Sequence, residues 1–393
     1  NTTIFNLDDI NIDNMKNSII ILLISFFTIS CGDPDFTTLL KSGGGGPAAD
    51  PTDQASVWSY RMGYHYVHLT RAFIYDENLI SVIQRDQHCV VQANNLASGD
   101  SIWTQASLGD CNPYRVNNCQ VEGDILVLSD ASRMAAVSMK TGELLWTDTT
   151  KDGEGEISII DGMVIKTASG LEYSSVYAID IFTGDKREIY REVISPIFKF
   201  GSGYFSPKKY VNTNGQDILL FYGRSVREGN TNSRLLALAY NLTLNTVEWK
   251  RTLRDDFQCT KISIVDDRAY LIGTDYLLCV STKNGSTIWQ RSVENRSDDF
   301  IIKDERIFVS SGAIFNMNSG AKVGDIDNIR LDNGMTIAQN KIFSCSYDLR
   351  VINTETLELT RYGERYSRYV VPHPTENWVY LTKGNSIFCL NLD

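Results

Sequence analysis

The chain has 393 residues, of which 42% are hydrophobic and 22% charged, the composition of an ordinary globular protein with a large core. Disorder over most of the chain is therefore excluded. The formal net charge is -11, and no basic run is longer than a pair such as Lys208 and Lys209. Nucleic-acid binding is disfavoured, because a phosphate backbone is held by clustered lysine and arginine side chains.

The N-terminal part of the chain contains a targeting segment. Residues 19–29 form an apolar run that has the length of a signal-peptide core, well short of the roughly 20 residues that a spanning helix needs. Lys16, directly after Met15, supplies the positive charge that precedes such a core. We interpret residues 15–30 as a lipoprotein signal peptide and the acidic residues 1–14 as an upstream non-native stretch.

The apolar run ends at a sequence that resembles a lipobox. Ser30 precedes Cys31, which would become the first mature residue and carry the acyl chains, although Thr28 stands where leucine is usual. We predict lipidation at Cys31 and membrane anchoring; plain secretion with an incidental cysteine is the alternative. The glycine-rich residues 31–54 are predicted to be a flexible tether that spans roughly 25–30 Å.

From residue 55 onward one pattern returns about every 40 residues, which indicates a propeller or a solenoid. In four copies a small residue precedes a tryptophan by ten positions. These pairs are Ala93 and Trp103, Ala136 and Trp146, Ala239 and Trp249, and Cys279 and Trp289. Equal spacing in four copies indicates one repeated structural unit.

Each of these copies also contains the residues of a tight turn. Turn formers follow the small residue by six positions, where a hairpin needs a positive φ: Gly99, Gly142, Asn245 and Gly285. Short polar residues that hydrogen-bond their own turn follow it by two positions: Asn95, Ser138, Asn241 and Ser281. The pattern therefore predicts two antiparallel strands joined by this turn. Residues 178–184 are the best further copy, with Glu188 in place of the tryptophan.

The consensus Ala-x-Asp-x-x-x-Gly-x-x-x-Trp closely resembles the blade motif of the pyrroloquinoline-quinone-type repeat β-propellers. The resemblance implies that these small residues, turn glycines and tryptophans dock neighbouring blades: Ala93, Trp103, Ala136, Trp146, Ala178, Gly184, Ala239, Trp249, Cys279, Trp289 and Trp58. In size, lipidation and single-propeller layout the chain resembles the lipoproteins of the outer-membrane β-barrel assembly machinery. That likeness implies a protein-binding role.

Counting copies predicts an all-β fold, an eight-bladed β-propeller over residues 55–393. The predicted blades are 77–107, 116–150, 155–192, 197–252, 257–293, 299–326, 330–362 and 366–393 with 55–62. The last blade stops before its outer strand, and the residues around Trp58 resemble that missing strand. We therefore predict that an N-terminal strand closes the ring, which removes open sheet edges. Seven blades is the alternative, because the short sixth unit lacks the turn spacing and the tryptophan.

The eight cysteines and four histidines give no recognisable catalytic or metal site. Quinone-dependent dehydrogenases share the blade motif but are larger chains that have two adjacent cysteines. No adjacent pair occurs here, so we expect no quinone or other cofactor. Cys111 and Cys119 flank a loop that a disulfide could close in an exported protein. His65 and His68 are three apart, a spacing that points to opposite faces of a strand and is wrong for chelation.

One interval departs from the repeat period. Trp146 and Trp249 are 103 residues apart where two repeats would need about 80. Residues 195–205 and 223–230 supply the excess and are rich in aromatic and arginine residues, which dominate binding hot spots. The candidate partner-binding residues are Phe198, Phe200, Tyr204, Phe205, Arg224 and Arg227. A longer hairpin with no partner is the plainer alternative.

Taken from the sequence, the expected function is that of a monomeric, membrane-anchored propeller that binds an envelope protein. We expect no enzyme activity, because hydrolase, metalloprotease and phosphate-loop motifs are missing from the sequence. The expected location is the bacterial envelope, at the outer membrane. The alternative function is an exported propeller that binds or converts a carbohydrate or small molecule at the mouth of its central channel.

Overall fold

Short apolar runs separated by tight turns make the described part of the chain all-β. The computed structural model describes residues 56–61, 68–85, 88–105, 108, 118–129, 133–149, 157–169, 173–193, 198–199, 207–226, 233–255, 259–273, 275–293, 297–326, 331, 334–345, 348–362, 370–383 and 386–392. Within these residues there is no helix, and hence none long and apolar enough to cross a membrane.

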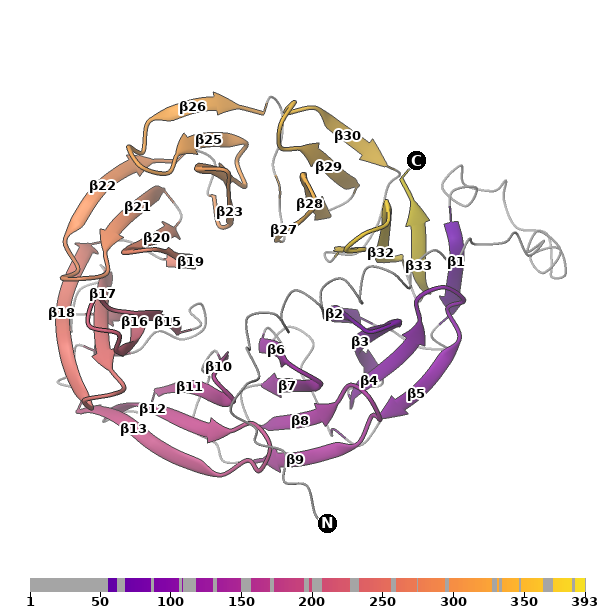
Figure 1. The fold of residues 1–393 in the computed structure, drawn as a ribbon, viewed down its shortest axis with the longest axis horizontal. Helices are drawn as coiled ribbons and strands as arrows, with labels where there is room; N and C mark the ends of the chain where they lie inside the picture. Colours follow the sequence, from indigo (N-terminus) through magenta and orange to yellow (C-terminus); the bar gives the residue numbers. More distant parts are fainter. Residues whose placement is uncertain are drawn as a thin grey trace, which may run out of the picture. The chain divides into compact units, whose positions relative to one another are not determined.

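The strands form eight antiparallel sheets arranged as the blades of a ring (Figure 1). All eight belong to one compact unit, Asp50–Asp393. Blades 1 to 4 consist of β2 (His68–Tyr75), β3 (Asn78–Arg85), β4 (His88–Asn95) and β5 (Ser101–Gln105); β6 (Asn118–Glu122), β7 (Ile125–Ser129), β8 (Met134–Ser138) and β9 (Leu144–Asp148); β10 (Ile157–Ile160), β11 (Met163–Ser169), β12 (Tyr173–Asp180) and β13 (Lys186–Val193); and β14 (Phe198–Lys199), β15 (Lys208–Val211), β16 (Asp217–Val226), β17 (Ser233–Asn241) and β18 (Thr246–Asp255).

Blades 5 to 8 follow the same order from the innermost to the outermost strand. They consist of β19 (Cys259–Val265), β20 (Arg268–Gly273), β21 (Tyr276–Ser281) and β22 (Thr287–Ser292); β23 (Phe300–Lys303), β24 (Arg306–Val309), β25 (Ala313–Asn316) and β26 (Lys322–Asp325); β27 (Met335–Ala338), β28 (Lys341–Cys345), β29 (Leu349–Asn353) and β30 (Leu359–Tyr362); and β31 (Val370–Pro372), β32 (Trp378–Lys383), β33 (Ser386–Asn391) and β1 (Ser56–Arg61).

The predicted eight-bladed propeller is confirmed, and the seven-bladed alternative is wrong. The sixth unit is a full four-stranded blade, β23 to β26, although it has no tryptophan. The first blade begins earlier than predicted, because β2 starts at His68 and not near residue 77. An innermost strand carries none of the motif residues, so the repeat spacing could not locate it.

The ring closes as predicted, through a strand from the N-terminal part of the chain. β1 pairs antiparallel with β33, and Trp58 lies opposite Cys389. The same register recurs in four other blades, where the small residue faces its tryptophan: Ala93 and Trp103, Ala136 and Trp146, Ala239 and Trp249, and Cys279 and Trp289. A β-bulge directly follows the small residue in those four blades. The constant spacing of ten is therefore a constant hairpin geometry.

Each of the five outer-strand tryptophans packs against a turn glycine of the next blade. A Cβ added to Gly142 would lie 2.6 Å from the Trp103 ring, closer than real Cβ atoms approach any atom. The other contacts of this kind join Trp58 to Gly99, Trp146 to Gly184, Trp249 to Gly285, and Trp289 to Gly320. These turn glycines all have a positive φ. Two independent constraints therefore require glycine there: the backbone conformation and the indole.

In two blades that follow a blade without this tryptophan, another residue replaces the turn glycine. Blade 3 has Glu188 in place of tryptophan, and the turn of blade 4 has Asn245 with a φ of 55°. Blade 6 has Gly324 at that position, and the turn of blade 7 has Leu357 with a φ of 62°. The positive φ persists in both turns. The tryptophan contact, rather than the φ alone, therefore explains the glycines.

Other contacts hold blade 3 to blade 4. Tyr240 packs on Tyr190, with ring centroids 5.3 Å apart, and its hydroxyl donates a hydrogen bond of 2.9 Å to the carbonyl of Ile189. On the channel side, Lys209 of blade 4 forms an ion pair with Asp161 of blade 3. An aromatic pair and a cross-blade ion pair therefore occupy the junction at which the tryptophan is missing.

The predicted disulfide between Cys111 and Cys119 is wrong. Cys119 carries a thiol that is buried in an apolar cluster with Val91 and Leu128, so its sulfur lies in the core. The structure places a disulfide at Cys89 instead, and its other cysteine lies outside the described residues, as does Cys111. Cys279 and Cys389 are buried thiols in the small-residue column.

The closure by β1 generates a stability prediction. Removing residues up to 62 deletes the outer strand of blade 8 together with the Trp58 side chain, which is 9% exposed. Loss of a buried tryptophan alone costs about 3–5 kcal/mol, a large part of a typical total of about 5–15 kcal/mol. We expect the shortened chain to aggregate or to melt far lower. A chain lacking only residues 31–50 should melt as the full one does, and equal melting temperatures for the two deletions would contradict this closure.

Candidate functional site

The innermost strands face the centre of the ring, and three of them border a pocket. β15, β19 and β23 point toward the ring centre in Figure 1 and belong to the consecutive blades 4, 5 and 6. The pocket has a volume of about 430 Å³. It is lined by Lys208, Lys209, Lys261, Ile262, Ser263, Ile264, Phe300, Ile301 and Ile302. Three lysines on one channel wall are notable in a chain of net negative charge.

The carboxylate of Asp299 holds one of these lysines in place. The Nζ atom of Lys261 lies 2.5 Å from Oδ1 of Asp299, and it also lies 5.8 Å above the ring of Phe300. The other carboxylate oxygen of Asp299 accepts a hydrogen bond of 2.6 Å from the backbone nitrogen of Met335, the first residue of β27. Asp299 therefore connects the inner strands of blades 5, 6 and 7, including the junction between blades 6 and 7 that lacks a tryptophan.

Lys209 is neutralised in a similar way. Its Nζ atom pairs with Asp161 and lies 2.9 Å from Oδ1 of Asp217. Burial of the ammonium lowers the pKa of Lys209, but the hydrogen bonds and charges of the two aspartates outweigh that effect and raise its pKa. Two of the three pocket lysines are thus already paired with carboxylates of their own chain. An external anion in this pocket would therefore have to compete with Asp161, Asp217 and Asp299 for these two lysines.

The histidines do not form a metal site in the described residues. No group of three or more metal-ligating side chains occurs in the part of the chain that the structure describes. His68 and His88 begin β2 and β4, and His65 lies outside the described residues. The Nδ1 atom of His373 accepts a hydrogen bond of 2.9 Å from the backbone nitrogen of Glu376, which caps the turn before β32. Burial lowers the pKa of His373.

The described residues of the predicted insertion belong to β14 and to the end of β16 in blade 4. β14 pairs with the C-terminal end of β16, and β15 pairs with its N-terminal end. Two short strands therefore share the edge that a single strand forms in the other blades. Among the candidate partner-binding residues, Phe198 and Arg224 have described backbones in β14 and β16. The others lie outside the described residues, as does Cys31: Phe200, Tyr204, Phe205 and Arg227.

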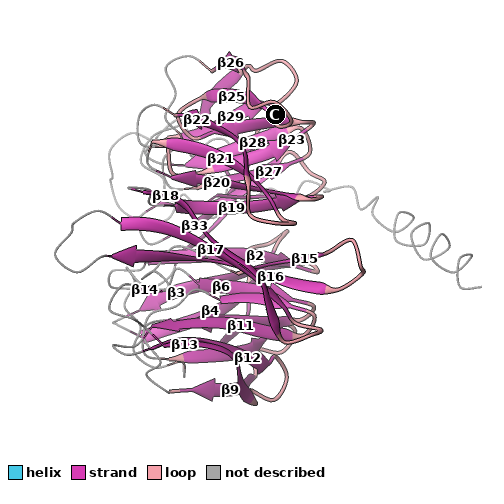
Figure 2. Ribbon diagram, turned by 90° about the vertical axis from the view of Figure 1, so that its left-hand side faces the viewer, coloured by secondary structure: helices cyan, strands magenta, loops and turns pink. Residues whose placement is uncertain are grey.

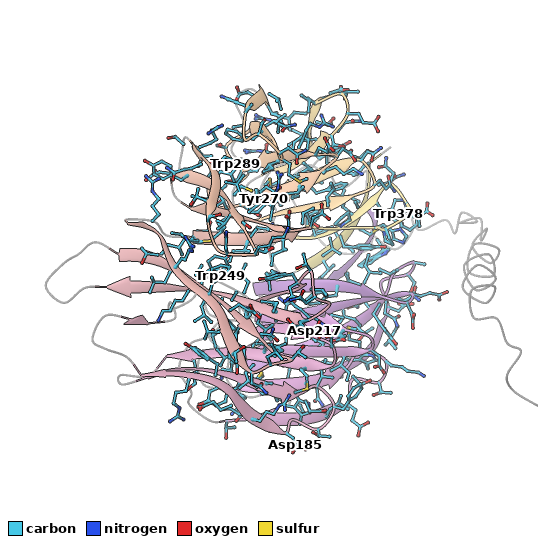
Figure 3. All side chains as sticks on the ribbon, turned by 60° about the vertical axis from the view of Figure 1, so that its left-hand side comes forward. Asp185, Asp217, Trp249, Tyr270, Trp289 and Trp378 are labelled. Carbon is cyan, nitrogen blue, oxygen red and sulfur yellow. The ribbon has the colours of Figure 1, made fainter. Side chains whose placement is uncertain are left out.

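Sequence reasoning missed the Asp299 bridge and two exposed apolar side chains, Phe182 and Leu244. A lone aspartate before an inner strand carries no sequence signal. Phe182 and Leu244 did have a sequence signal, since the corresponding turn positions of the other blades hold polar or small residues. Figure 3 labels Trp249 and Trp289, which lie in the outer strands β18 and β22.

The geometry defines an eight-bladed β-propeller, and comparisons with known proteins agree with the repeat type. The family model described as outer membrane protein assembly factor BamB matches residues 42–200. This match, together with the fold, confirms the resemblance predicted from the blade motif. Over residues 42–200 the chain is thus similar to the propellers built from pyrroloquinoline-quinone-type repeats.

Solved structures with the same fold are only distantly similar in sequence. BamB from Moraxella catarrhalis is 13% identical with a TM-score of 0.58, over 86% of this chain and 97% of that chain. Sqt1 from Saccharomyces cerevisiae is 11% identical with a TM-score of 0.62, over 86% and 99%. The Dos1 propeller is 9% identical with a TM-score of 0.59, over 85% and 94%. At these identities the likeness shows the fold. A search of curated proteins found no match.

The Asp299 bridge generates a prediction. In an Asp299→Asn variant the amide cannot neutralise Lys261, and it can satisfy only part of the hydrogen bonds that the carboxylate accepts. We expect a loss of about 1–3 kcal/mol in the free energy of unfolding, because the site is largely covered. The exposed Asp304→Asn change should cost less than about 0.5 kcal/mol. Equal losses, measured by urea unfolding, would show that Asp299 does not connect the blades.

Proposed function

We propose that this chain is a membrane-anchored lipoprotein of the bacterial envelope that binds other proteins as a scaffold and does not catalyse a reaction. Its proposed role is in the assembly of outer-membrane proteins. The observation that carries the proposal is the match of residues 42–200 to the family described as outer membrane protein assembly factor BamB. Because fold alone does not carry function, that match rather than the propeller shape supports the role.

Two further observations support an exported protein. The first is the sequence at Cys31, an apolar run followed by a small residue and a cysteine. The second is the disulfide at Cys89, since structural disulfides persist in oxidising compartments and are rare in the cytosol. Cys31 would carry the acyl chains and residues 31–54 would tether the propeller to the membrane.

A second candidate function is the binding of a small molecule in the channel pocket. The pocket volume of about 430 Å³ falls within the range of known ligand sites. Against it, Lys209 and Lys261 are held by aspartates of the same chain, so a ligand would have to displace internal ion pairs. Protein binding is therefore the function that the observations favour.

The anchor is tested by a Cys31→Ala variant of the full chain. We expect the unchanged chain to incorporate radiolabelled palmitate and to fractionate with membranes, and the variant to lose both properties. A single acyl-bearing residue would account for both effects. Membrane association that survives the substitution, with no label in either form, would contradict the lipoprotein proposal.

The scaffold role is tested by affinity purification of the full chain from solubilised membranes, followed by identification of the bound proteins. We expect a β-barrel protein or another envelope assembly component in stoichiometric amount. A bound small molecule with no protein partner would contradict the scaffold role and favour the second candidate.

A further inference from the structure

A histidine caps the turn between β31 and β32. His373 is half-buried at the start of this turn, and its backbone nitrogen donates a hydrogen bond of 2.9 Å to the carbonyl of Trp378, five residues on. The Nδ1 atom of its imidazole accepts hydrogen bonds from the backbone nitrogens of Thr375, at 3.3 Å, and Glu376, at 2.9 Å. The side chain therefore satisfies two backbone donors of the turn.

Asparagine or aspartate has this role in other turns of the chain. Four turns are closed by the same bond, from the first backbone nitrogen to the carbonyl five residues on, and begin at Asn95, Asp180, Asn316 and Asn353. In each of them one Oδ1 atom accepts hydrogen bonds from the backbone nitrogens two and three residues further along. The Nδ1 atom of His373 bonds the same two positions. It therefore takes the place of the usual side-chain oxygen.

A histidine differs from an asparagine cap because one proton can abolish its function as an acceptor. A backbone N–H can only donate, so Nδ1 of His373 carries no hydrogen, and the hydrogen of the neutral ring lies on Nε2. Protonation of the ring must therefore occur at Nδ1, the capping atom itself. In the imidazolium both ring nitrogens are donors, so both hydrogen bonds of the cap are lost.

The groups around His373 set the pH at which this happens. Burial lowers the pKa of His373, and the carboxylate of Glu376 opposes that effect. From blade 7 the ammonium of Lys341 reaches the turn, and from β32 comes Tyr380, whose pKa burial raises, so its phenol is uncharged. The apolar cluster around Tyr380 adds side chains from blade 1, β1 and β33: Ala72, Ile74, Leu79, Trp58 and the buried thiol of Cys389.

The direction of the pH dependence follows from the lowered pKa. The folded state binds the proton less readily than the unfolded chain, in which a histidine has a pKa of about 6.5. The contribution of His373 to stability is therefore fully present above about pH 6.5 and is lost as the pH falls through the folded value.

The capped turn is part of the contact between blades 7 and 8. Gln339, in the turn between β27 and β28, donates from Nε2 to the carbonyl of Thr375 at 3.0 Å, and Lys341 donates from Nζ to Oδ1 of Asn377 at 2.7 Å. The carbonyl of Asn377 also accepts a hydrogen bond of 2.9 Å from the backbone nitrogen of Leu392, which follows β33. The conformation of the turn therefore determines whether these cross-blade bonds can form.

This junction lacks the tryptophan contact that joins five others. The outer strand of blade 7, β30, contains no tryptophan, and no turn joins β33 to β1 in blade 8, because these strands come from distant parts of the chain. Figure 1 shows β32 and β33 beside β1, and Figure 2 shows described turns in pink, mainly along its right-hand side. A change in the turn between β31 and β32 therefore acts on a junction that the tryptophan contact does not reinforce.

We propose that His373 is a pH-sensitive cap at the junction between blades 7 and 8. With a neutral ring, the turn keeps the geometry that Gln339 and Lys341 bond. With a protonated ring, the two capping hydrogen bonds are lost, the turn opens, and blade 7 loses these contacts with blade 8. The proposal is independent of the scaffold role and adds a regulation of the ring by pH.

Hydrogen exchange of the full chain tests this cap at about pH 7.5 and about pH 5, with exchange times scaled for the intrinsic rate at each pH. We expect the protection of the Thr375 and Glu376 amides to fall about five- to tenfold at the lower pH, the effect of losing one or two hydrogen bonds of ordinary strength. The turn that Asn353 caps in blade 7 is the internal control, and its protection should not change.

The variant His373→Asn supplies an oxygen acceptor that cannot be protonated, and it should keep the protection at both pH values. His373→Ala should have low protection at both. In the nitrogen NMR spectrum, the imidazole that is missing from His373→Asn should be protonated at Nε2 at about pH 7.5 and should titrate below about 6.5. Full protection of the unchanged chain at about pH 5, an equal loss in His373→Asn, or a ring protonated at Nδ1 at about pH 7.5 would overturn the proposal.

Discussion

The contact between an outer-strand tryptophan and a turn glycine of the next blade is the interaction on which the ring depends. Each indole occupies the space where a glycine side chain would begin, so neighbouring blades can approach only if that residue has no Cβ. Three of the indoles also donate a hydrogen bond to a turn carbonyl, at 2.7 Å from Trp58 and Trp249 and at 2.8 Å from Trp146. At these five junctions of the eight-bladed ring the contact therefore fixes both the spacing and the orientation of neighbouring sheets.

The repeat motif made most of this architecture predictable. The spacing of ten between Ala93 and Trp103 reports a hairpin register, and the likeness of the Trp58 segment to later outer strands revealed the closing strand. Innermost strands could not be predicted as well, because their side chains face a channel and follow no motif. The predicted disulfide between Cys111 and Cys119 was wrong for a related reason. Proximity in sequence does not show to which side of a strand a side chain points.

The candidate site was less predictable than the fold. Asp299 acts through contacts with two other blades, and such contacts join residues that are far apart in sequence. The exposed apolar turns could have been found by aligning the repeats and asking where the middle of a turn becomes hydrophobic. Departures from a repeat therefore deserve the same scrutiny as its consensus: Glu188, Asn245 and Leu244 together mark one junction that differs from the five tryptophan junctions.

The most direct test of the account is a double-mutant cycle between Trp103 and Gly142, with Gly215→Ala as a control. Gly215 has a similar positive φ but nothing within 4 Å of an added Cβ. In the unchanged background we predict that Gly142→Ala costs about 2–4 kcal/mol of unfolding free energy, the sum of backbone strain and overpacking. With Trp103→Ala present, the same change should cost only about 1–2 kcal/mol, as Gly215→Ala does. An equal cost of Gly142→Ala in both backgrounds would show that the tryptophan does not impose the glycine.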